Sequence, residues 1–402
     1  MSERAAVDER TVRIERPATG GAVARLDDGR VVFVRHALPG ELVVVGLTEV
    51  TSRYARADAL RVIEPSPQRV SAPCPYAAPG LCGGCDLQHA SSAAQVEWKR
   101  AVATEHLARL AHLDVDLDVE AAPSPAARSR TRLRCAVDPE GRLGLYRSRS
   151  HDVVALDDCW IADQRVTPAF GARWRGALEV ELRAIGDGEA FAVVTRPDGS
   201  RETTTLGNEP RSAVASRVAV GDHRFTVSPG SFWQAHRDAP TVLSDAVREL
   251  AQLERGDAAV DLYSGVGLFT VALARAVGPD GRVTAVESSP DSAADALDNV
   301  RAMGRVRVRQ WPVAPRAVYD VVGEGDVVVV DPPRTGLGRG VAAALARRRP
   351  RRVVYVSCDA ATFARDLGEL VAGGYELARL RAFDLFPMTE HLELVALLDR
   401  VA

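Results

Sequence analysis

The sequence contains almost no lysine: of its 51 basic residues, Lys99 is the single lysine and the other 50 are arginines. The 54 acidic residues outnumber them, and the formal net charge of −3 excludes a protein that is basic throughout. Local basic patches remain compatible with this balance. We attribute the preference for arginine over lysine to coding bias in a proteome rich in alanine and arginine.

Long apolar runs are also absent, and no stretch approaches the ~20 apolar residues of a membrane span. The first residues carry acidic side chains and lack an apolar segment, so we expect no signal peptide. Six cysteines in 402 residues are too few for a disulfide scaffold. We therefore expect a cytoplasmic protein with reduced thiols and no membrane partner, and we expect it to be a monomer.

The composition, 46% hydrophobic and 26% charged, is that of a globular protein, and the length predicts two or three domains. Near the N-terminus, short runs rich in β-branched residues alternate with Gly and Pro turns, which predicts a small closed barrel. A helix-like spacing of apolar residues follows. The predicted barrel strands are 12–14, 31–34, 42–47 and 57–63, and the predicted helix is 91–113.

The rest of the chain divides into two patterns. A middle region alternates β-like runs with turns, whereas the last part alternates strands with helices, which predicts a doubly wound parallel sheet. We therefore expect an α/β protein with a barrel at 1–66, a central α+β domain at 67–222 and a Rossmann-like domain at 223–402, with the 91–113 helix packing on the last domain. The predicted strands are 132–137, 143–146 and 191–195, then 258–263, 282–287, 326–330 and 352–357.

A glycine-rich loop follows the first strand of the predicted C-terminal sheet. The segment DLYSGVGLF (261–269) places Gly265 and Gly267 between that strand and a helix, where a ligand can approach the backbone closely. The dinucleotide fingerprint requires a third glycine where the chain has Thr270, so a nucleoside without pyrophosphate, such as S-adenosylmethionine, fits better. Glu287 ends the next strand, where its carboxylate can accept both ribose hydroxyls. The alternative for Glu287 is an ordinary helix-capping acid.

Two further strands of this sheet end in distinctive segments. Asp331 and Arg334 flank two prolines that fix the backbone, and Cys358 follows the next strand. Ligand sites of such sheets lie at the carboxyl ends of the strands, where these residues fall. A thiolate there can add to carbon 6 of a pyrimidine, which makes carbon 5 nucleophilic enough to take a methyl group. The alternative for Cys358 is a small side chain that only packs.

Such a mechanism requires a base that removes the proton from carbon 5. Glu393 lies among aliphatic residues at the end of the segment FPMTEHLE (386–393), just before an apolar final strand. Burial there would raise its pKa toward the range that suits proton abstraction. An acid on a solvated strand face is the alternative.

The segments DLYSGVGLF, DPPR, YVSCD and FPMTEHLE, in this order, resemble the RNA 5-methyluridine (uracil-C5) methyltransferase family, and the resemblance covers nearly all of the chain. It implies an S-adenosylmethionine-dependent enzyme with Cys358 as nucleophile and Glu393 as base. The N-terminal strands, which include FVRHALPGE (33–41), resemble a TRAM domain, an RNA-binding barrel. The resemblance also implies a set of residues around the cofactor and the uracil: Gln234, Tyr263, Glu287 and Asp331, supported by Arg334 and His391.

The chain departs from the family pattern at a few positions. Asp359 and Ala360 replace an asparagine and a proline after the cysteine, His236 stands where asparagine is common, and Ser264 stands where cysteine is often found. These changes concern details of the pocket and leave both reacting groups in place. We expect them to affect the choice of substrate and not the chemistry.

Four cysteines are candidates for a metal site. Cys74, Cys82 and Cys85 lie in the segment CPYAAPGLCGGC, and Cys159 lies far downstream. Four thiolates suit either zinc or an iron–sulfur cluster, and the spacing alone does not separate the two. The family resemblance implies a [4Fe–4S] cluster with a structural or RNA-positioning role, because methyl transfer needs no electrons. Cys135 is expected only to pack.

An arginine-rich segment follows the predicted helix. Arg128, Arg130, Arg132 and Arg134 alternate along the chain, which predicts that they share one face of a strand. Residues 128–151 carry seven arginines and two acids, a charge of +5. A solvated edge strand would explain this, but arginine forks also match phosphates. We interpret these four residues, together with Arg334, as RNA-binding.

These observations predict methyl transfer from S-adenosylmethionine to carbon 5 of a specific uridine in structured RNA, with the base flipped into the pocket. The combination of a cluster with a TRAM-like barrel favours 23S ribosomal RNA over transfer RNA. One alternative is an amino-group N-methyltransferase of RNA, which would need neither Cys358 nor Glu393. The other is a catalytically silent RNA-binding protein with a zinc site.

Overall fold

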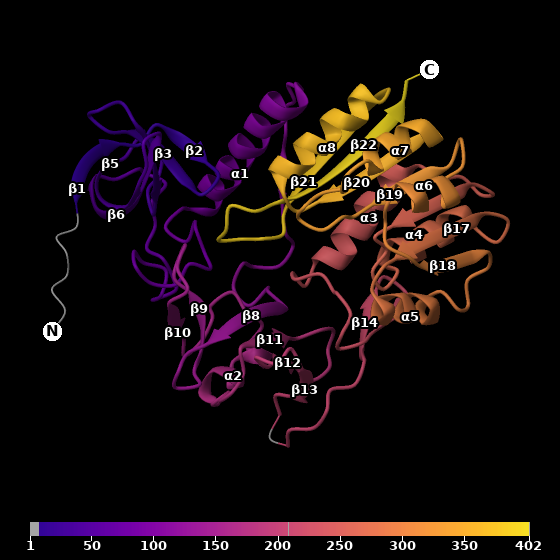
Figure 1. Ribbon diagram of the computed structural model, residues 1–402, viewed down its shortest axis with the longest axis horizontal. Helices are drawn as coiled ribbons and strands as arrows, with labels where there is room; N and C mark the ends of the chain where they lie inside the picture. Colours follow the sequence, from indigo (N-terminus) through magenta and orange to yellow (C-terminus); the bar gives the residue numbers. More distant parts are fainter. Residues whose placement is uncertain (1–7, 208, 402) are drawn as a thin grey trace.

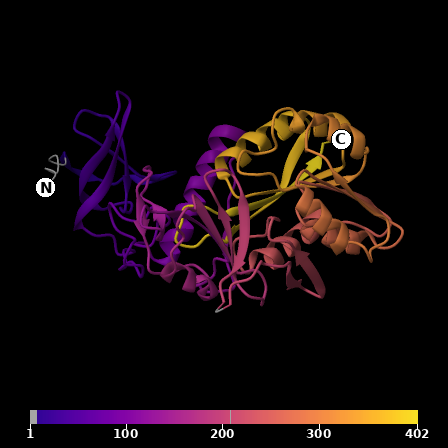
Figure 2. The same cartoon turned by 60° about the horizontal axis from the view of Figure 1, so that its bottom comes forward.

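The structure, a computed structural model, describes residues 8–207 and 209–401 (Figure 1). Three regions follow one another along the chain: an N-terminal β domain, a central sheet and a C-terminal sheet covered by helices (Figures 1 and 2). The first seven residues of the interval expected to form the barrel lie outside the described residues. Within the part that is described, no helix is long and apolar enough to cross a membrane.

The N-terminal domain is one six-stranded sheet in the order β1-β5-β6-β4-β3-β2. Only two residues, Ile14 and Glu15, separate its two edge strands, β1 and β2, so the sheet curls back on itself. The Glu15 amide donates to the Val23 carbonyl at 2.8 Å across this closure. The predicted small β domain is confirmed, with these strands: β1 (Glu9–Arg13), β2 (Arg16–Ala18), β3 (Gly21–Arg25), β4 (Val31–Arg35), β5 (Leu42–Val50) and β6 (Tyr54–Glu64).

The helix predicted over 91–113 is α1 (Ser92–His106), continued by a π-helical turn, η1 (Leu107–Ala111). Trp98 packs into the core of the N-terminal domain, whereas Leu107 belongs to the core of the C-terminal sheet. The helix therefore uses two different stretches of its surface to join these domains, and it lies between them in Figure 2. It packs on the last domain as expected.

The central region is a six-stranded sheet in the order β10-β9-β8-β11-β12-β13. Its two faces serve different cores because neighbouring side chains of a strand point to opposite sides. Phe191 and Val193 of β12 join the C-terminal core, whereas Ala192 and Val194 pack with the cysteine segments. The elements are β8 (Arg132–Val137), β9 (Leu143–Tyr146), β10 (Val153–Ala155), η2 (Gln164–Val166), α2 (Pro168–Gly171), β11 (Glu179–Arg183), β12 (Phe191–Thr195) and β13 (Arg201–Thr205).

The C-terminal sheet has eight strands in the order β18-β17-β16-β19-β20-β22-β21-β7. The first five are mutually parallel, which confirms the predicted Rossmann-like sheet, and β22 is antiparallel to both of its neighbours. The strands are β7 (Val119–Ala121), β16 (Ala258–Leu262), β17 (Arg282–Glu287), β18 (Val306–Gln310), β19 (Val327–Val330), β20 (Arg352–Ser357), β21 (Tyr375–Asp384) and β22 (Glu393–Arg400).

Helices cover both faces of this sheet (Figure 1). α3 and α4 share one apolar core with it, and α6, α7 and α8 share the other. The bounds are α3 (Ala239–Ala251), α4 (Leu268–Val277), α5 (Pro290–Asn299), α6 (Pro315–Val321), α7 (Val341–Arg348) and α8 (Ala360–Ala372).

Two segments that lie wholly or partly within the interval expected for the central domain belong to the C-terminal half. β7 lies within the interval 67–222 yet pairs with β21 and so extends the C-terminal sheet. The hairpin of β14 (Ser216–Val220) and β15 (His223–Val227) crosses residue 222, and it is joined to α5 by the amide of Asn299, which donates to the Thr226 carbonyl at 3.0 Å.

Candidate active site

Cys358 and Glu393 face each other at one edge of the C-terminal sheet. Ser357, the last residue of β20, pairs with Leu394 of β22, so the next residue on each strand toward the edge is Cys358 and Glu393 respectively. Because β22 is antiparallel to β20, its first residue lies at the edge where the parallel strands end. The sheet register thus brings the predicted nucleophile and base together.

Both reacting groups have raised pKa values. Burial, reinforced by the nearby Glu393 carboxyl, raises the pKa of the Cys358 thiol to about 12, while the Arg334 guanidinium opposes the shift. Burial and the nearby Asp331 raise the pKa of Glu393 well above its usual value, again opposed by Arg334. Glu393 is only 5% exposed. Burial therefore favours the protonated form of both groups.

Two aspartates lie near this edge, Asp261 fully buried and Asp331 half-buried. Burial raises the pKa of Asp331, which follows β19, to about 7, and the nearby Asp261 adds to the shift. Asp261 lies in β16 and accepts a hydrogen bond from the Thr270 hydroxyl at 2.5 Å, and burial raises its pKa to about 7 as well. Among the described residues, the second oxygen of Asp261 has no hydrogen-bond partner. The negative charge at this edge of the sheet therefore depends on whether these two carboxyls are protonated.

The predicted cofactor loop connects β16 to α4. Gly265 and Gly267 have φ values of +54° and +89°, which a residue with a side chain rarely adopts. Glu287 at the end of β17 accepts hydrogen bonds from the Gly265 amide at 2.9 Å and the Ser289 amide at 2.7 Å, one on each carboxylate oxygen. Tyr263 donates from its hydroxyl to the Leu337 carbonyl. Glu287 is therefore held in place beside the glycine loop.

Gln234 contacts the central domain. The Thr131 side chain donates to the Gln234 carbonyl at 3.1 Å, and Gln234 borders a narrow gap with Arg132, Arg183 and Trp233. No hydrogen bond in the described part of the chain joins Gln234 to Glu287 or Asp331.

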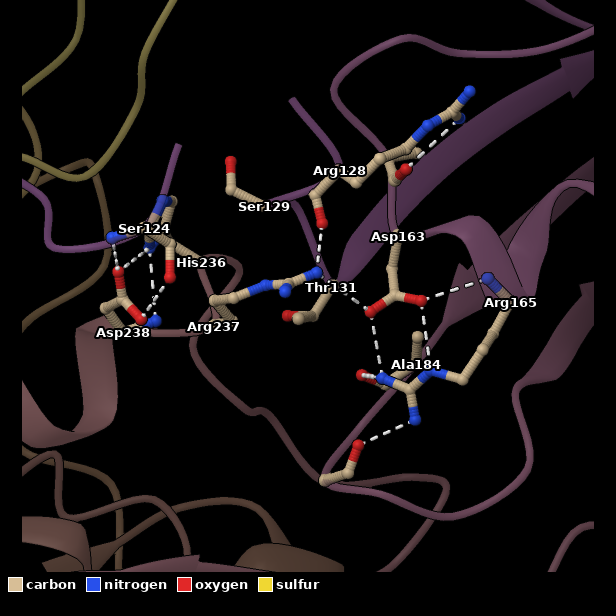
Figure 3. Close-up of polar contacts among 12 residues, drawn as sticks. Ser124, Arg128, Ser129, Thr131, Asp163, Arg165, Ala184, His236, Arg237 and Asp238 are labelled. Carbon is tan, nitrogen blue, oxygen red and sulfur yellow. Dashed lines mark hydrogen bonds and ion pairs between the residues drawn. The ribbon is translucent and has the colours of Figure 1, made fainter. Parts of the chain in front are cut away.

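The loop that carries Gln234 is fixed by the polar network of Figure 3. Asp238 accepts hydrogen bonds from the Ser124 amide at 2.7 Å and hydroxyl at 2.9 Å. The Arg237 guanidinium donates to the Arg128 carbonyl and lies 3.4 Å from an oxygen of Asp163. These contacts tie the 234–238 loop to the segment that precedes β8.

Cys74, Cys82, Cys85 and Cys159 line one cavity, whose empty volume of about 410 Å³ includes space open to solvent. Arg130 lines the same cavity. Within residues 8–207 and 209–401, no group of three or more His, Cys, Asp or Glu side chains is arranged to hold a metal ion. Cys135 is fully buried in β8 and does not line this cavity, in agreement with a packing role.

The prediction that four arginines share one strand face is wrong. β8 begins at Arg132, and Arg128 lies before it with a φ of +58°. The local cause is the pairing of this segment with a neighbouring loop: the Arg128 amide donates to the Trp160 carbonyl at 3.1 Å.

Acids outside the segment also neutralise much of its charge. Arg128 pairs with Asp158 at 2.5 Å, and Arg132 pairs with Glu181 at 2.7 Å. Arg134 lies 3.2 Å from Glu179 but keeps 64% of its side chain exposed. A charge count over consecutive residues could not show these partners because they lie on other segments of the chain.

The motifs did not identify the residues that hold the loop before Glu393. Lys99 and Gln95 of α1 contact this loop directly. The one available signal was compositional, because Lys99 is the single lysine of the chain.

Family models match three parts of the chain. The TRAM domain matches residues 4–60, and the tRNA (Uracil-5-)-methyltransferase model matches residues 323–401, which include Cys358 and Glu393. A protein-L-isoaspartate(D-aspartate) O-methyltransferase model matches residues 230–326, the first half of the C-terminal sheet.

Full-length relatives extend this likeness to the whole chain. An uncharacterized RNA methyltransferase of Streptomyces coelicolor is 40% identical over 98% of this chain and 93% of its own length. One from Corynebacterium efficiens is 38% identical over 98% of this chain and 95% of its own length. The chain belongs to the RNA uracil-C5 methyltransferase family.

A solved structure shares the architecture of the enzyme. The Pyrococcus abyssi tRNA (uracil-54, C5)-methyltransferase, in complex with S-adenosyl-L-homocysteine, is 25% identical with a TM-score of 0.70. The match covers 96% of the enzyme and 99% of that chain. The fold and the cofactor class follow: the enzyme is an S-adenosylmethionine-dependent methyltransferase with an N-terminal TRAM domain.

Proposed function

We propose that the enzyme methylates carbon 5 of a uridine in structured RNA through a covalent bond between Cys358 and the base. The observation that carries this proposal is the register of β20 and β22, which sets Cys358 opposite Glu393. A thiol and a carboxyl facing each other beside a methyl-donor site provide the nucleophile and the base that the reaction needs. S-adenosylmethionine, when bound, supplies the methyl group.

In the first step, the Cys358 thiolate forms a bond to carbon 6, and the electron pair of the carbon 5–carbon 6 double bond moves toward the oxygen on carbon 4. Carbon 5 then bonds to the methyl carbon, while the bond from that methyl to the donor sulfur breaks and leaves its electron pair on the sulfur. Finally the Glu393 carboxylate takes the proton from carbon 5. The double bond forms again, and the thiolate of Cys358 leaves.

Arg334 and Asp331 shift the pKa values of Cys358 and Glu393 in opposite directions. We propose that Arg334 stabilises the Cys358 thiolate, since its positive charge lowers the pKa of this thiol. Asp331 acts in the opposite direction, because its carboxyl raises the pKa of both Cys358 and Glu393. We further propose that Gln234, Tyr263, Gly265, Gly267, Glu287 and Asp331 surround the cofactor and the uracil.

For the substrate, we propose 23S ribosomal RNA, with transfer RNA as the second candidate. The TRAM domain is suited to bind the RNA, the central domain to orient it, and the C-terminal domain to accept the flipped uridine. We assign these roles to the predicted intervals 1–66, 67–222 and 223–402, except that β7 and the β14–β15 hairpin go with the C-terminal domain. The Pyrococcus abyssi relative acts on uracil 54 of tRNA, so both RNA classes belong in the experiment.

We propose that Cys74, Cys82, Cys85 and Cys159 hold a [4Fe–4S] cluster. All four line one cavity, and thiolates are the ligands that such clusters use. The resemblance of the cysteine segment to the family's cluster site favours iron–sulfur over zinc. The cluster would contribute to structure, since no step above transfers electrons.

We propose Arg334 and Arg134 as RNA contacts, because both side chains are exposed. Arg130 borders the cysteine cavity and its guanidinium lies 5.9 Å from the centre of the Phe386 ring, beside the loop that leads to Glu393. Arg128 and Arg132 contribute less, because Asp158 and Glu181 already satisfy them.

The decisive test is covalent trapping. With RNA and S-adenosylmethionine, Glu393→Gln should transfer the methyl group but fail to release the enzyme, so that a methylated RNA–protein adduct survives denaturing gel electrophoresis. Cys358→Ala should form no adduct and no 5-methyluridine. Full activity of Cys358→Ala would contradict the proposal and favour an amino-group N-methyltransferase.

The RNA is identified by mapping 5-methyluridine in total RNA from a strain that lacks the gene. We expect one uridine of 23S ribosomal RNA to lose its methyl group. Loss in transfer RNA would redirect the substrate assignment, and an unchanged map would contradict the proposed function. A protein that contains zinc without iron and does not bind S-adenosylmethionine would support the silent RNA-binding alternative.

A further inference from the structure

Lys99 is the one position where the enzyme uses lysine instead of arginine. It lies on α1 and is fully buried, with 0% of the residue exposed. A buried ammonium group is costly unless it is paired and hydrogen-bonded. The charge of Lys99 must therefore be compensated by polar neighbours.

The Lys99 ammonium contacts the start of the loop that leads to Glu393. It donates to the carboxylate of Asp384, the last residue of β21, and to the Phe386 carbonyl at 2.9 Å. Residues 385–392 then connect β21 to β22, whose first residue is Glu393. In Figure 1, this loop reaches back from the C-terminal sheet toward α1. Lys99 thus joins a helix to both the strand end and the loop.

The middle of the same loop is held at Met388. The Met388 amide donates to the Gln95 side chain at 2.9 Å, one helical turn before Lys99. The Met388 carbonyl accepts from the amides of Asp86 and Leu87 at 3.0 and 2.9 Å. Met388 has a φ of +68°, which a residue with a side chain adopts only when its surroundings enforce it.

The contacts of Lys99 suit an ammonium group better than a guanidinium. Lysine presents a compact charge with donors that rotate freely, whereas arginine presents a larger planar fork. The two acceptors belong to residues only two apart in the chain, and the site leaves no part of Lys99 exposed to solvent. An arginine here would have to displace its neighbours.

We propose that Lys99 is a positioning residue that sets the loop before β22 and thereby places the Glu393 carboxylate against carbon 5 of the bound uracil. The proposal rests on the function proposed above. Lys99 contacts the loop that leads to Glu393 and lies on a different element from Cys358. Its loss should therefore slow proton removal from carbon 5 more than it slows the addition of the thiolate to carbon 6.

The test compares Lys99→Met with Glu393→Gln in the full-length protein, mixed with total RNA from the deletion strain and labelled S-adenosylmethionine. Denaturing gels follow the formation and the decay of the methylated RNA–protein adduct. We expect Lys99→Met to form the adduct at nearly the wild-type rate but to resolve it about 10- to 100-fold more slowly, as a small misplacement of a catalytic group does. S-adenosylmethionine affinity should be unchanged.

Arg100→Ala is the matched control, because Arg100 is the next residue of α1 and, among the described residues, its one ion pair is with Glu97 at the surface. It should behave as the wild type. If Lys99→Met does not fold, the double variant Lys99→Met/Asp384→Leu removes both charges, and we expect it to trap the adduct as well.

Two results would overturn the role of Lys99 alone: adduct resolution at the wild-type rate, or an equal loss of adduct formation and cofactor binding. Absence of an adduct in Glu393→Gln itself would overturn the proposed function, and this inference with it.

Discussion

At the scale of single residues, the active site is a set of acidic groups whose pKa values are raised by burial. The pKa of Glu393 is raised well above its usual value, that of Asp331 is raised to about 7, and that of Cys358 to about 12. Arg334 is the cation that opposes the shifts of Cys358 and Glu393. Activity should therefore depend on pH and on this one arginine.

The proposed chemistry requires Cys358 as thiolate and Glu393 as carboxylate, so both must lose a proton. Because both pKa values are raised, the single-turnover rate of methylation should increase with pH through and above neutrality. Arg334→Met should lower the rate at neutral pH by roughly tenfold, the effect of one pKa unit on the thiolate population. A rate that falls with increasing pH would contradict this assignment.

At the scale of elements, the backbone of the cysteine loop lies in close contact with the end of β9 and the residues that follow it. A β-carbon added at Gly83 would lie 2.6 Å from the amide nitrogen of Ser148, whereas one at Gly84 would meet a movable methyl group of Leu145 at 2.9 Å and the Cys82 sulfur at 3.5 Å, an ordinary contact. The Gly83 amide also donates to the Tyr146 carbonyl at 3.0 Å. Gly83 is therefore needed for close approach to β9, and Gly84 much less so.

We expect Gly83→Ala to shift the loop and to cost about 1–3 kcal/mol of stability, the usual price of overpacking. Because Cys82 and Cys85 flank this position, the iron content and the visible absorbance of the purified protein should fall. Gly84→Ala is the matched control and should retain its iron. Equal iron in both variants would contradict the role of Gly83.

At the scale of the whole molecule, the loop before Glu393 is where three regions meet. The Gly20 amide of the TRAM domain donates to the Glu390 carboxylate at 2.7 Å. Asp86 and Leu87 from the cysteine loop hold Met388, and α1 holds both Phe386 and Met388. The parts proposed to bind RNA and the cluster thus contact the segment that precedes the base.

Removal of one proposed cluster ligand should therefore affect catalysis at a distance. Cys82→Ser should lose iron and lower the melting temperature, and it should reduce methylation because Asp86 and Leu87 would hold Met388 less firmly. Cofactor binding, measured by calorimetry, should be unchanged, because Gly265 and Glu287 follow or end strands of the C-terminal sheet, away from the cysteine loop in the chain. Cys135→Ala, a change of a thiol outside the cavity, should keep its iron. Full activity of iron-free Cys82→Ser would contradict this coupling.

The sequence by itself determined the β-domain, the strand and helix alternation of the C-terminal half and the candidate groups Cys358 and Glu393. These features depend on local patterns: apolar periodicity, turn residues and short motifs that stand at strand ends. The predicted strands 282–287 and 352–357 agree residue for residue with β17 and β20.

Only the tertiary structure decided which distant residues meet. It paired Arg128 and Arg132 with acids on other segments, which reduced the basic face expected from the count of charges. It placed the single lysine, whose rarity looked like coding bias, under the loop that leads to the base. The physical reason is that charge pairing and burial depend on separation in space, and a linear pattern records only separation along the chain.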